Sequence, residues 1–210
     1  GRINAVAFDK TGTLTEGRPS LTEVIALQPL ADHADAHPTT TGEGWTADQE
    51  EILRWAAIAE SGSEHPLARP VMAAASDIPA LDADSFTVYP GQGVAAAHAG
   101  HLVTVGNTDL MGGLGIPVGK RVVEELAQLR QAGRTAVAVA LDDRVIGILG
   151  IDDAVRPEAA RTIAELRANG VERILMLTGD DRQTALAVGR QVGIDEIHAD
   201  LMPDDKLTLI

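Results

Sequence analysis

The sequence FDKTGTLTEG, residues 8–17, is the most restrictive pattern in this chain of 210 residues. The apolar run Ala5–Phe8 is short and typical of a buried parallel strand, so Asp9 is expected at the carboxyl end of that strand. Ligands of open α/β sheets bind at this end of the strands. A carboxylate placed there can act as a covalent nucleophile toward phosphorus, and we interpret Asp9 in this way.

Polar groups that suit a phosphoryl group follow two of the predicted strands. Asp9 is followed directly by a lysine, threonines and a glycine, and a second apolar strand, predicted at 174–177, is followed by Thr-Gly-Asp. Because the carboxyl ends of parallel strands lie at one edge of a sheet, both loops are expected at the same site. Hydroxyls, backbone N–H groups and cations there would stabilise the phosphoryl oxygens. The candidates are Thr11, Gly12, Thr13, Thr178 and Lys206, and Asp152 begins a third candidate loop.

The last part of the chain alternates between predicted helices and strands. Such alternation is typical of βαβ units, whose parallel strands need crossover helices. The predicted helices span 157–168 and 182–192 and open again at Pro203, and the predicted strands span 174–177 and begin again at Ile197.

The middle of the chain has a different pattern. Thr46 and Gln49 form a capping box that begins a helix. Two alternating runs on either side of Asp142-Asp143 predict a hairpin, which indicates antiparallel pairing. We therefore predict an α/β domain formed by residues 1–25 and 149–210, interrupted by an α+β domain with an antiparallel sheet over residues 26–148.

The composition excludes several classes of partner. The formal net charge is −14, which argues against nucleic acid or anionic lipid as a ligand. There is no cysteine, and therefore no disulfide framework and no thiolate metal site. No apolar run in the sequence is long enough to span a bilayer.

The segment DKTGTLTEG resembles the phosphorylation signature of the P-type ATPases, which are ion pumps built on the haloacid dehalogenase-like fold. The resemblance covers essentially the whole chain. It implies a Rossmann-like phosphorylation domain of haloacid dehalogenase type, C-terminally incomplete, that is interrupted by a nucleotide-binding domain.

The same resemblance implies roles for single residues. ATP would phosphorylate Asp9, and Asp152 matches the aspartate that precedes the family's Arg/Lys-Pro-Glu segment and helps to hold the site. Mg²⁺ would bind the carboxylate of Asp9 and the carbonyl of Thr11. The chain stops before the family's Gly-Asp-Gly-x-Asn-Asp segment, so we expect this region alone to bind nucleotide and to form little phosphoenzyme. The phosphoryl group would be surrounded by Lys10, Thr11, Thr13, Thr178, Gly179, Asp180 and Lys206.

The predicted insert resembles the nucleotide-binding domain of the heavy-metal subgroup of these pumps. The matching segments are Ser63–Leu67, Gly91–Val94 and Gly106–Met111. The resemblance implies that Glu60 hydrogen-bonds the adenine amino group and that His65 orients the nucleotide. Gly91 and Gly93 would line the pocket, and Asn107 would act near the ribose or the phosphates.

The resemblance also implies cofactors and partners. ATP and Mg²⁺ would be the cofactors, and the partners would be the transmembrane and actuator domains of the same pump. The transported heavy-metal cation would bind outside this chain. The full-length protein would lie in the cell membrane, with this region soluble on the cytoplasmic side. The segments 153–160 and 172–180 look closer to the zinc/cadmium/cobalt branch than to the copper branch.

Two other functions remain open at this point. A stand-alone phosphatase of this superfamily would carry a second aspartate at the position of Thr11, and such a general acid/base is worth about 10²–10⁴-fold in rate. A nucleotide-binding module that never catalyses is the other alternative; membrane-spanning segments on both sides of this region would favour the pump. His33 and His37 stand four residues apart in the loop 28–45, but no third ligand accompanies them, and an exposed loop is the simpler interpretation.

Overall fold

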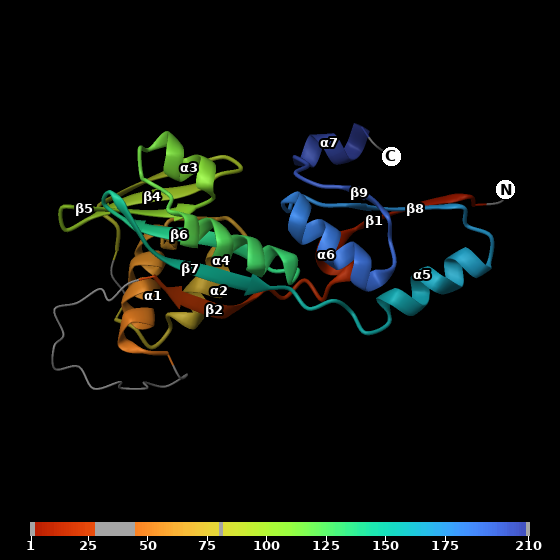
Figure 1. Cartoon of the computed structure of the whole chain (residues 1–210), viewed down its shortest axis with the longest axis horizontal. Coiled ribbons are helices and arrows are strands. Elements are labelled where there is room, and N and C mark those ends of the chain that lie inside the picture. Colours follow the sequence, from red (N-terminus) through yellow and green to blue (C-terminus); the bar gives the residue numbers. More distant parts are fainter. Residues whose placement is uncertain (1–2, 28–44, 80–81, 209–210) are drawn as a thin grey trace. The chain divides into compact units, whose positions relative to one another are not determined.

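The computed structural model describes residues 3–27, 45–79 and 82–208 (Figure 1). They form two compact units, which we call unit 1 (residues 1–19, 127–135 and 152–210) and unit 2 (residues 20–126 and 136–151). The expected limits of the insert, residues 26 and 148, remain a prediction. The contacts within the chain group residues 127–135 with unit 1.

Unit 1 contains a three-stranded parallel sheet in the order β1-β8-β9. Its strands are β1 (Ala5–Asp9), β8 (Arg173–Leu177) and β9 (Glu196–His198). Asp9 pairs with Leu177, and Leu177 pairs with His198, so all three strands end at the same edge. This register confirms the expected parallel sheet, and it brings the residues after β1 and β8 to one edge.

Three helices complete unit 1: α5 (Ala159–Ala168), α6 (Arg182–Val192) and α7 (Pro203–Thr208). Asp181 caps the start of α6 with its side chain, and Gly193 ends it in a left-handed conformation with φ of 80°, where glycine has no steric penalty. The helix α6 connects β8 to β9, as a parallel pair requires. The core of the unit includes Leu14, Ile163, Ile174, Met176, Val188 and Ile194.

Unit 2 is built on a six-stranded sheet in the order β2-β7-β6-β5-β4-β3. The pairs β3/β4, β4/β5 and β5/β6 are antiparallel. The predicted hairpin is present, because β6 and β7 are neighbours joined by the two-residue turn Asp142-Asp143. The strands are β2 (Ser20–Ala26), β3 (Ser85–Tyr89), β4 (Gly93–His98), β5 (His101–Gly106), β6 (Thr135–Leu141) and β7 (Arg144–Asp152).

The helices of unit 2 begin at recognisable caps. Thr46 and Gln49 form both hydrogen bonds of the predicted capping box. A short helix that we did not predict, α3, is capped by the side chain of Asn107, which accepts from the N–H of Leu110. Helix α1 packs against α2 and against strands β2, β4 and β5. The helices are α1 (Ala47–Glu60), α2 (Ala68–Ala74), α3 (Thr108–Gly113) and the first part of α4 (Lys120–Gln131), whose residues from 127 onward belong to unit 1.

Two further expectations concern membranes and the long loop. In residues 3–27, 45–79 and 82–208, no helix combines the length and the apolar character that crossing a bilayer requires. His33 and His37 lie outside the described residues.

Candidate active site

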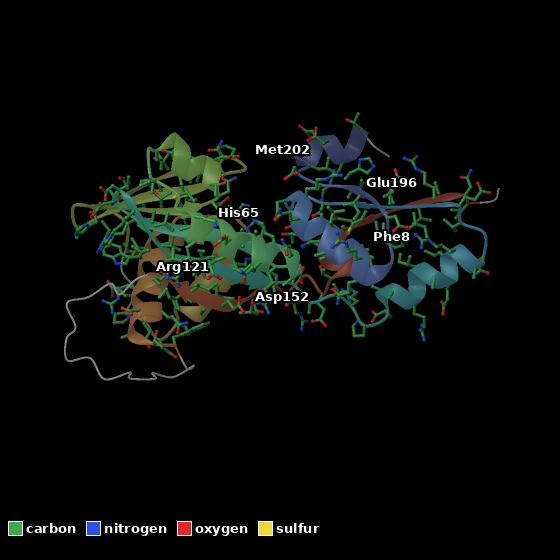
Figure 2. All side chains as sticks on the ribbon, in the orientation of Figure 1. Phe8, His65, Arg121, Asp152, Glu196 and Met202 are labelled. Carbon is green, nitrogen blue, oxygen red and sulfur yellow. The ribbon has the colours of Figure 1, made fainter. Side chains whose placement is uncertain are left out.

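The predicted nucleophile, Asp9, lies at the end of β1 and pairs with a lysine from the far end of the chain. Lys206 Nζ lies 2.7 Å from Asp9 Oδ1. The Asp9 side chain is 47% exposed and that of Lys206 is 30% exposed. Phe8, the preceding residue of β1, is labelled in Figure 2. An exposed carboxylate beside a cation can be reached by an anionic phosphoryl donor whose charge the lysine partly neutralises.

A second lysine–aspartate pair lies in the same unit, with its lysine buried and its aspartate 18% exposed. Lys10 is only 5% exposed, and its Nζ lies 2.6 Å from Asp180 Oδ2. The hydroxyl of Thr178, also buried, donates to the same carboxylate oxygen at 2.6 Å and accepts from the N–H of Asp180 at 3.1 Å. Lys10 therefore holds the Thr-Gly-Asp loop against the loop that follows Asp9.

The turn Lys10–Leu14 leaves two of the predicted hydroxyls in water. Thr11 and Thr13 are exposed, and Gly12 between them has φ of 76°, a conformation that side-chain-bearing residues rarely adopt. The N–H of Gly12 donates to Thr15 Oγ1 at 3.2 Å. Thr15 is fully buried and fixes the turn. The motif alone does not show that Thr15 has this structural role while Thr11 and Thr13 are exposed.

The aspartate that holds this turn is Asp153 rather than Asp152. The Thr15 hydroxyl donates to Asp153 Oδ2 at 2.5 Å, and the N–H of Arg18 donates to Asp153 Oδ1 at 3.0 Å. Asp152 is the last residue of β7, so it continues the strand, and only the next residue turns toward the loop. The role that the resemblance implies for Asp152 stays a prediction, and the contacts of Asp153 add a second aspartate that supports the turn.

A neighbouring arginine adds to this support. Arg156 donates from its N–H to the carbonyl of Leu14 at 2.9 Å and from Nη2 to the carbonyl of Gly12 at 3.3 Å. An isolated bridge between Thr15 and Val155 completes the attachment. The segment after β7 thus fixes the backbone of the turn that carries the exposed threonines.

In unit 2, three of the predicted nucleotide-binding residues lie together. Asn107 donates from its backbone N–H to the carbonyl of Gln92 at 2.9 Å and from Nδ2 to the carbonyl of Gly91 at 3.3 Å. Gly93 has φ of 146°, and a Cβ there would lie 2.1 Å from the carbonyl oxygen of Val105. Any other residue at this position would force the two loops apart, so the glycine keeps the backbone at Gly91–Gly93 close to Asn107.

Glu60 ends α1 in a buried position. It is 6% exposed, and a hydrogen bond from the Ser63 side chain reaches its carboxyl group. Among the described residues, its Oε2 has no hydrogen-bond partner. Burial raises the pKa of Glu60, and the bond from Ser63 lowers it by less. A buried acceptor without a partner is costly, so a ligand that brings an N–H donor would be favoured there.

His65 begins the turn before α2 and is labelled in Figure 2. Its Nδ1 accepts from the N–H of Leu67 at 3.2 Å, and its own backbone N–H donates to Ser63 Oγ at 3.2 Å. Burial lowers the pKa of the ring, and a neutral ring with Nδ1 as acceptor carries its proton on Nε2. Among the described residues, no hydrogen bond joins Glu60 or His65 to the Gly91–Asn107 group.

We expect the substitution Glu60→Gln to change the pH dependence of stability. Because the folded protein raises the pKa of Glu60 above 4.5, ionising this group costs stability. The wild-type chain should therefore lose stability as the pH rises from about 4.5 through the higher folded pKa, and Glu60→Gln should remove this loss and be the more stable at pH 7. Thermal unfolding between pH 4 and 8 measures the effect. Glu64→Gln, at an exposed position nearby, is the matched control, and an equal change in both variants would contradict the assignment to Glu60.

The described residues suit a magnesium ion only together with a phosphate. No group of three or more His, Cys, Asp or Glu side chains in this part of the chain is arranged to hold a metal. Mg²⁺ is commonly bound through one or two carboxylates, water and the phosphates of a substrate. The exposed carboxylate of Asp9 fits that kind of incomplete site.

Comparison with known families gives a match over nearly the whole chain. The haloacid dehalogenase-like hydrolase family matches residues 3–210. The chain is 37% identical over 212 residues to a zinc-exporting P-type ATPase of Mycobacterium marinum, covering 100% of this chain and 27% of that protein. It is 36% identical to a manganese-exporting P-type ATPase of Mycobacterium tuberculosis, again with 100% and 27% coverage. The chain thus spans about a quarter of the length of these curated relatives.

Solved structures agree with this match. A zinc-transporting PIB-type ATPase in the E2.Pi state superposes with a TM-score of 0.63 at 32% identity, covering 100% of this chain and 31% of that one. The catalytic domain of the CPx-ATPase CopB-B gives a TM-score of 0.61 at 23% identity, covering 99% and 65%, which indicates a shared fold.

Proposed function

This chain belongs to the haloacid dehalogenase-like hydrolase family, and we propose that it transfers the γ-phosphoryl group of ATP to Asp9. Within that family, the chain matches the phosphorylation and nucleotide-binding region of heavy-metal P-type ATPases. The observation that carries the proposal is the 2.7 Å contact between Lys206 Nζ and the exposed carboxylate of Asp9. A carboxylate oxygen of Asp9 would attack the γ-phosphorus. The bond to the bridging oxygen would break, and ADP would leave with that electron pair, so no proton transfer is needed.

The charges around Asp9 support this step. Lys206 would neutralise part of the incoming phosphoryl charge, and the exposed hydroxyls of Thr11 and Thr13 would donate to its oxygens. Lys10, Thr178 and Asp180 would act by holding the loops in place, because Lys10 is buried and paired with Asp180. Mg²⁺, when bound by Asp9, the carbonyl of Thr11 and phosphate oxygens, would supply further charge neutralisation.

Thr11 favours a pump over a phosphatase. A hydroxyl group cannot act as the general acid/base that the second aspartate of the phosphatases provides. An aspartyl phosphate at Asp9 would therefore persist long enough to drive a conformational change. A nucleotide-binding module without catalysis would have no need of the Asp9–Lys206 pair.

The whole protein is proposed to be a membrane pump for a transition-metal cation. The zinc and manganese in the names of the relatives support a transition-metal cation as the transported class. This region would lie on the cytosolic side, joined to transmembrane and actuator domains of the same pump. Its own role would be to bind ATP and to store the energy of the phosphoryl bond.

We expect unit 2 to provide the ATP affinity, and His65→Ala to reduce it roughly ten- to a hundredfold. The loss of one hydrogen-bonding side chain costs about 1–3 kcal/mol, which corresponds to this change in Kd. NMR titration of the chain with ATP, followed at the backbone amides, measures both the affinity and the place of binding. Shifts around Lys120 with none near His65 would place the nucleotide elsewhere.

A further inference from the structure

The turn that joins α4 to β6 packs, within unit 1, against the loop that follows β8. Gly133 follows α4 with φ of 85°, and its N–H donates to the carbonyl of Arg130 at 2.9 Å. The N–H of Arg134 donates to the carbonyl of Leu129 at 3.1 Å, which completes a Schellman motif. The backbone that leads into β6 therefore leaves the helix in one defined direction.

Two contacts attach this turn to the start of α6. Arg130 Nε lies 3.7 Å from Oδ2 of Asp181, the residue that caps α6. The buried hydroxyl of Thr184 lies 3.0 Å from the carbonyl oxygen of Arg134 and 2.5 Å from Asp181 Oδ2. The turn is thus attached to the cap and the first turn of α6, directly after the Thr-Gly-Asp loop.

A third contact reaches the aspartate of that loop. The Thr135 hydroxyl donates to Asp180 Oδ1 at 3.3 Å. The other oxygen of the same carboxylate, Oδ2, is bound by Lys10 Nζ and by the Thr178 hydroxyl, each at 2.6 Å. A carboxylate bound through both oxygens is held in one orientation, whereas a carboxylate bound through one oxygen can rotate about its Cβ–Cγ bond. Thr135 therefore fixes the orientation in which Asp180 meets its other partners.

The orientation of Asp180 matters because its cationic partner directly follows the predicted nucleophile. Lys10 is the residue after Asp9, and its buried ammonium group pairs with Asp180 Oδ2. A rotation of the Asp180 carboxylate would displace Lys10 and the backbone that carries Asp9. Attack on phosphorus needs aligned atoms, and a displacement of about 1 Å can cost about 100-fold in rate.

We propose that Thr135 is a positioning residue for phosphoryl transfer, acting on Asp9 through Asp180 and Lys10. The proposal rests on the phosphorylation of Asp9 proposed above. It adds a residue from the turn between α4 and β6, outside the loops in which the sequence places the phosphorylation site. Because Thr135 acts through Asp180 and not on the nucleotide, its loss should lower the rate of the covalent step and leave the affinity for ATP unchanged.

The test measures the rate of phosphoenzyme formation by full-length variants over a range of ATP concentrations. Thr135→Val keeps the shape of the side chain and removes the hydroxyl donor. It should lower the rate at saturating ATP roughly tenfold, as the loss of a hydrogen bond to a charged group does, while the half-saturating ATP concentration stays at the wild-type value. Thr135→Ser keeps the hydroxyl and should retain the wild-type rate.

Thr22→Val is the matched control. Thr22 is also a strand residue, and its hydroxyl donates over the same 3.3 Å, but to the carbonyl of Gly150 in unit 2. The control therefore removes an equivalent hydrogen bond outside the phosphorylation site, and it should leave the rate at the wild-type level.

A second measurement follows the proposed route of action directly in this chain. The chain contains three lysines, so a sample labelled with ¹⁵N in lysine gives few ammonium signals, and Lys120→Met and Lys206→Met identify that of Lys10 by elimination. Thr135→Val should shift the Lys10 ammonium signal, because the carboxylate that pairs with it is no longer held through both oxygens. Thr22→Val should leave that signal unchanged.

An unchanged Lys10 signal in Thr135→Val would overturn the proposal. So would a rate equal to that of Thr22→Val, an equal loss of rate in Thr135→Ser, or a loss confined to ATP affinity. Failure of the proposed function is recognised separately. A wild-type pump that takes no acid-stable label on Asp9 would refute the phosphorylation, and the positioning role with it, even where the Lys10 signal shifts.

Discussion

Replacing Asp9 by Asn is expected to abolish the acid-stable label that the pump takes from γ-labelled ATP. The amide keeps the shape of the carboxylate and can still accept a hydrogen bond from Lys206, which lies 2.7 Å from Oδ1. It is not a nucleophile toward phosphorus, so the covalent step should stop while nucleotide binding continues. The full-length protein that contains this region is the appropriate sample, with phosphoenzyme quantified after acid quenching.

A control in the same unit separates chemistry from stability. Asp195→Asn removes a carboxylate that is 96% exposed, and it should leave labelling at the wild-type level. ATP binding by the Asp9→Asn variant should also be retained, which shows that the protein is folded. Wild-type labelling of Asp9→Asn would mean that another residue accepts the phosphoryl group.

The largest expected effect on stability comes from the buried pair Lys10–Asp180. Asp180→Asn would leave the Lys10 ammonium group buried without a counter-charge, and breaking such a pair typically costs about 3–5 kcal/mol. Most of this loss should be recovered in the double variant Lys10→Met/Asp180→Leu, because two apolar side chains leave no charge buried. Chemical denaturation of the chain, monitored by circular dichroism, measures the free energy of unfolding of each variant.

The Asp9–Lys206 pair is expected to contribute much less to the free energy of unfolding than the Lys10–Asp180 pair. Its side chains are partly exposed, Lys206 to 30% and Asp9 to 47%, so Lys206→Met should change the free energy of unfolding by at most about 1 kcal/mol. Equal effects of Lys206→Met and Asp180→Asn would contradict the assignment of Lys10–Asp180 as the structural pair. Lys206→Met should still reduce phosphorylation strongly, since the lysine lies next to the nucleophile.

Much of the fold follows from local patterns. The capping box at Thr46 and Gln49 and the helix that ends at Gly193 were predictable because each depends on neighbouring residues. The parallel sheet and the hairpin around Asp142-Asp143 followed from the alternation of helices and strands and from strand periodicity. The short helix α3 was missed, since six residues with two glycines carry no clear helical period.

Some features of the candidate site could likewise be predicted from the sequence, and others could not. Asp9 could be named from the sequence because the end of a parallel strand is a binding edge whatever the rest of the chain does. The choice between Asp152 and Asp153 depends on where β7 stops and on which carboxylate reaches Thr15, a residue far away in the sequence. The motif alone does not contain that information.

The sequence was sufficient for the order of the elements and for the family resemblance, because these depend on residue type and short-range spacing. Tertiary structure was needed for the partners: Lys10 with Asp180, Lys206 with Asp9, and Thr135 with Asp180. The physical reason is that burial and pairing arise where segments distant in the chain meet. A lysine is buried, as Lys10 is, or partly exposed, as Lys206 is, according to what packs around it, and hydrophobic periodicity carries no record of that packing.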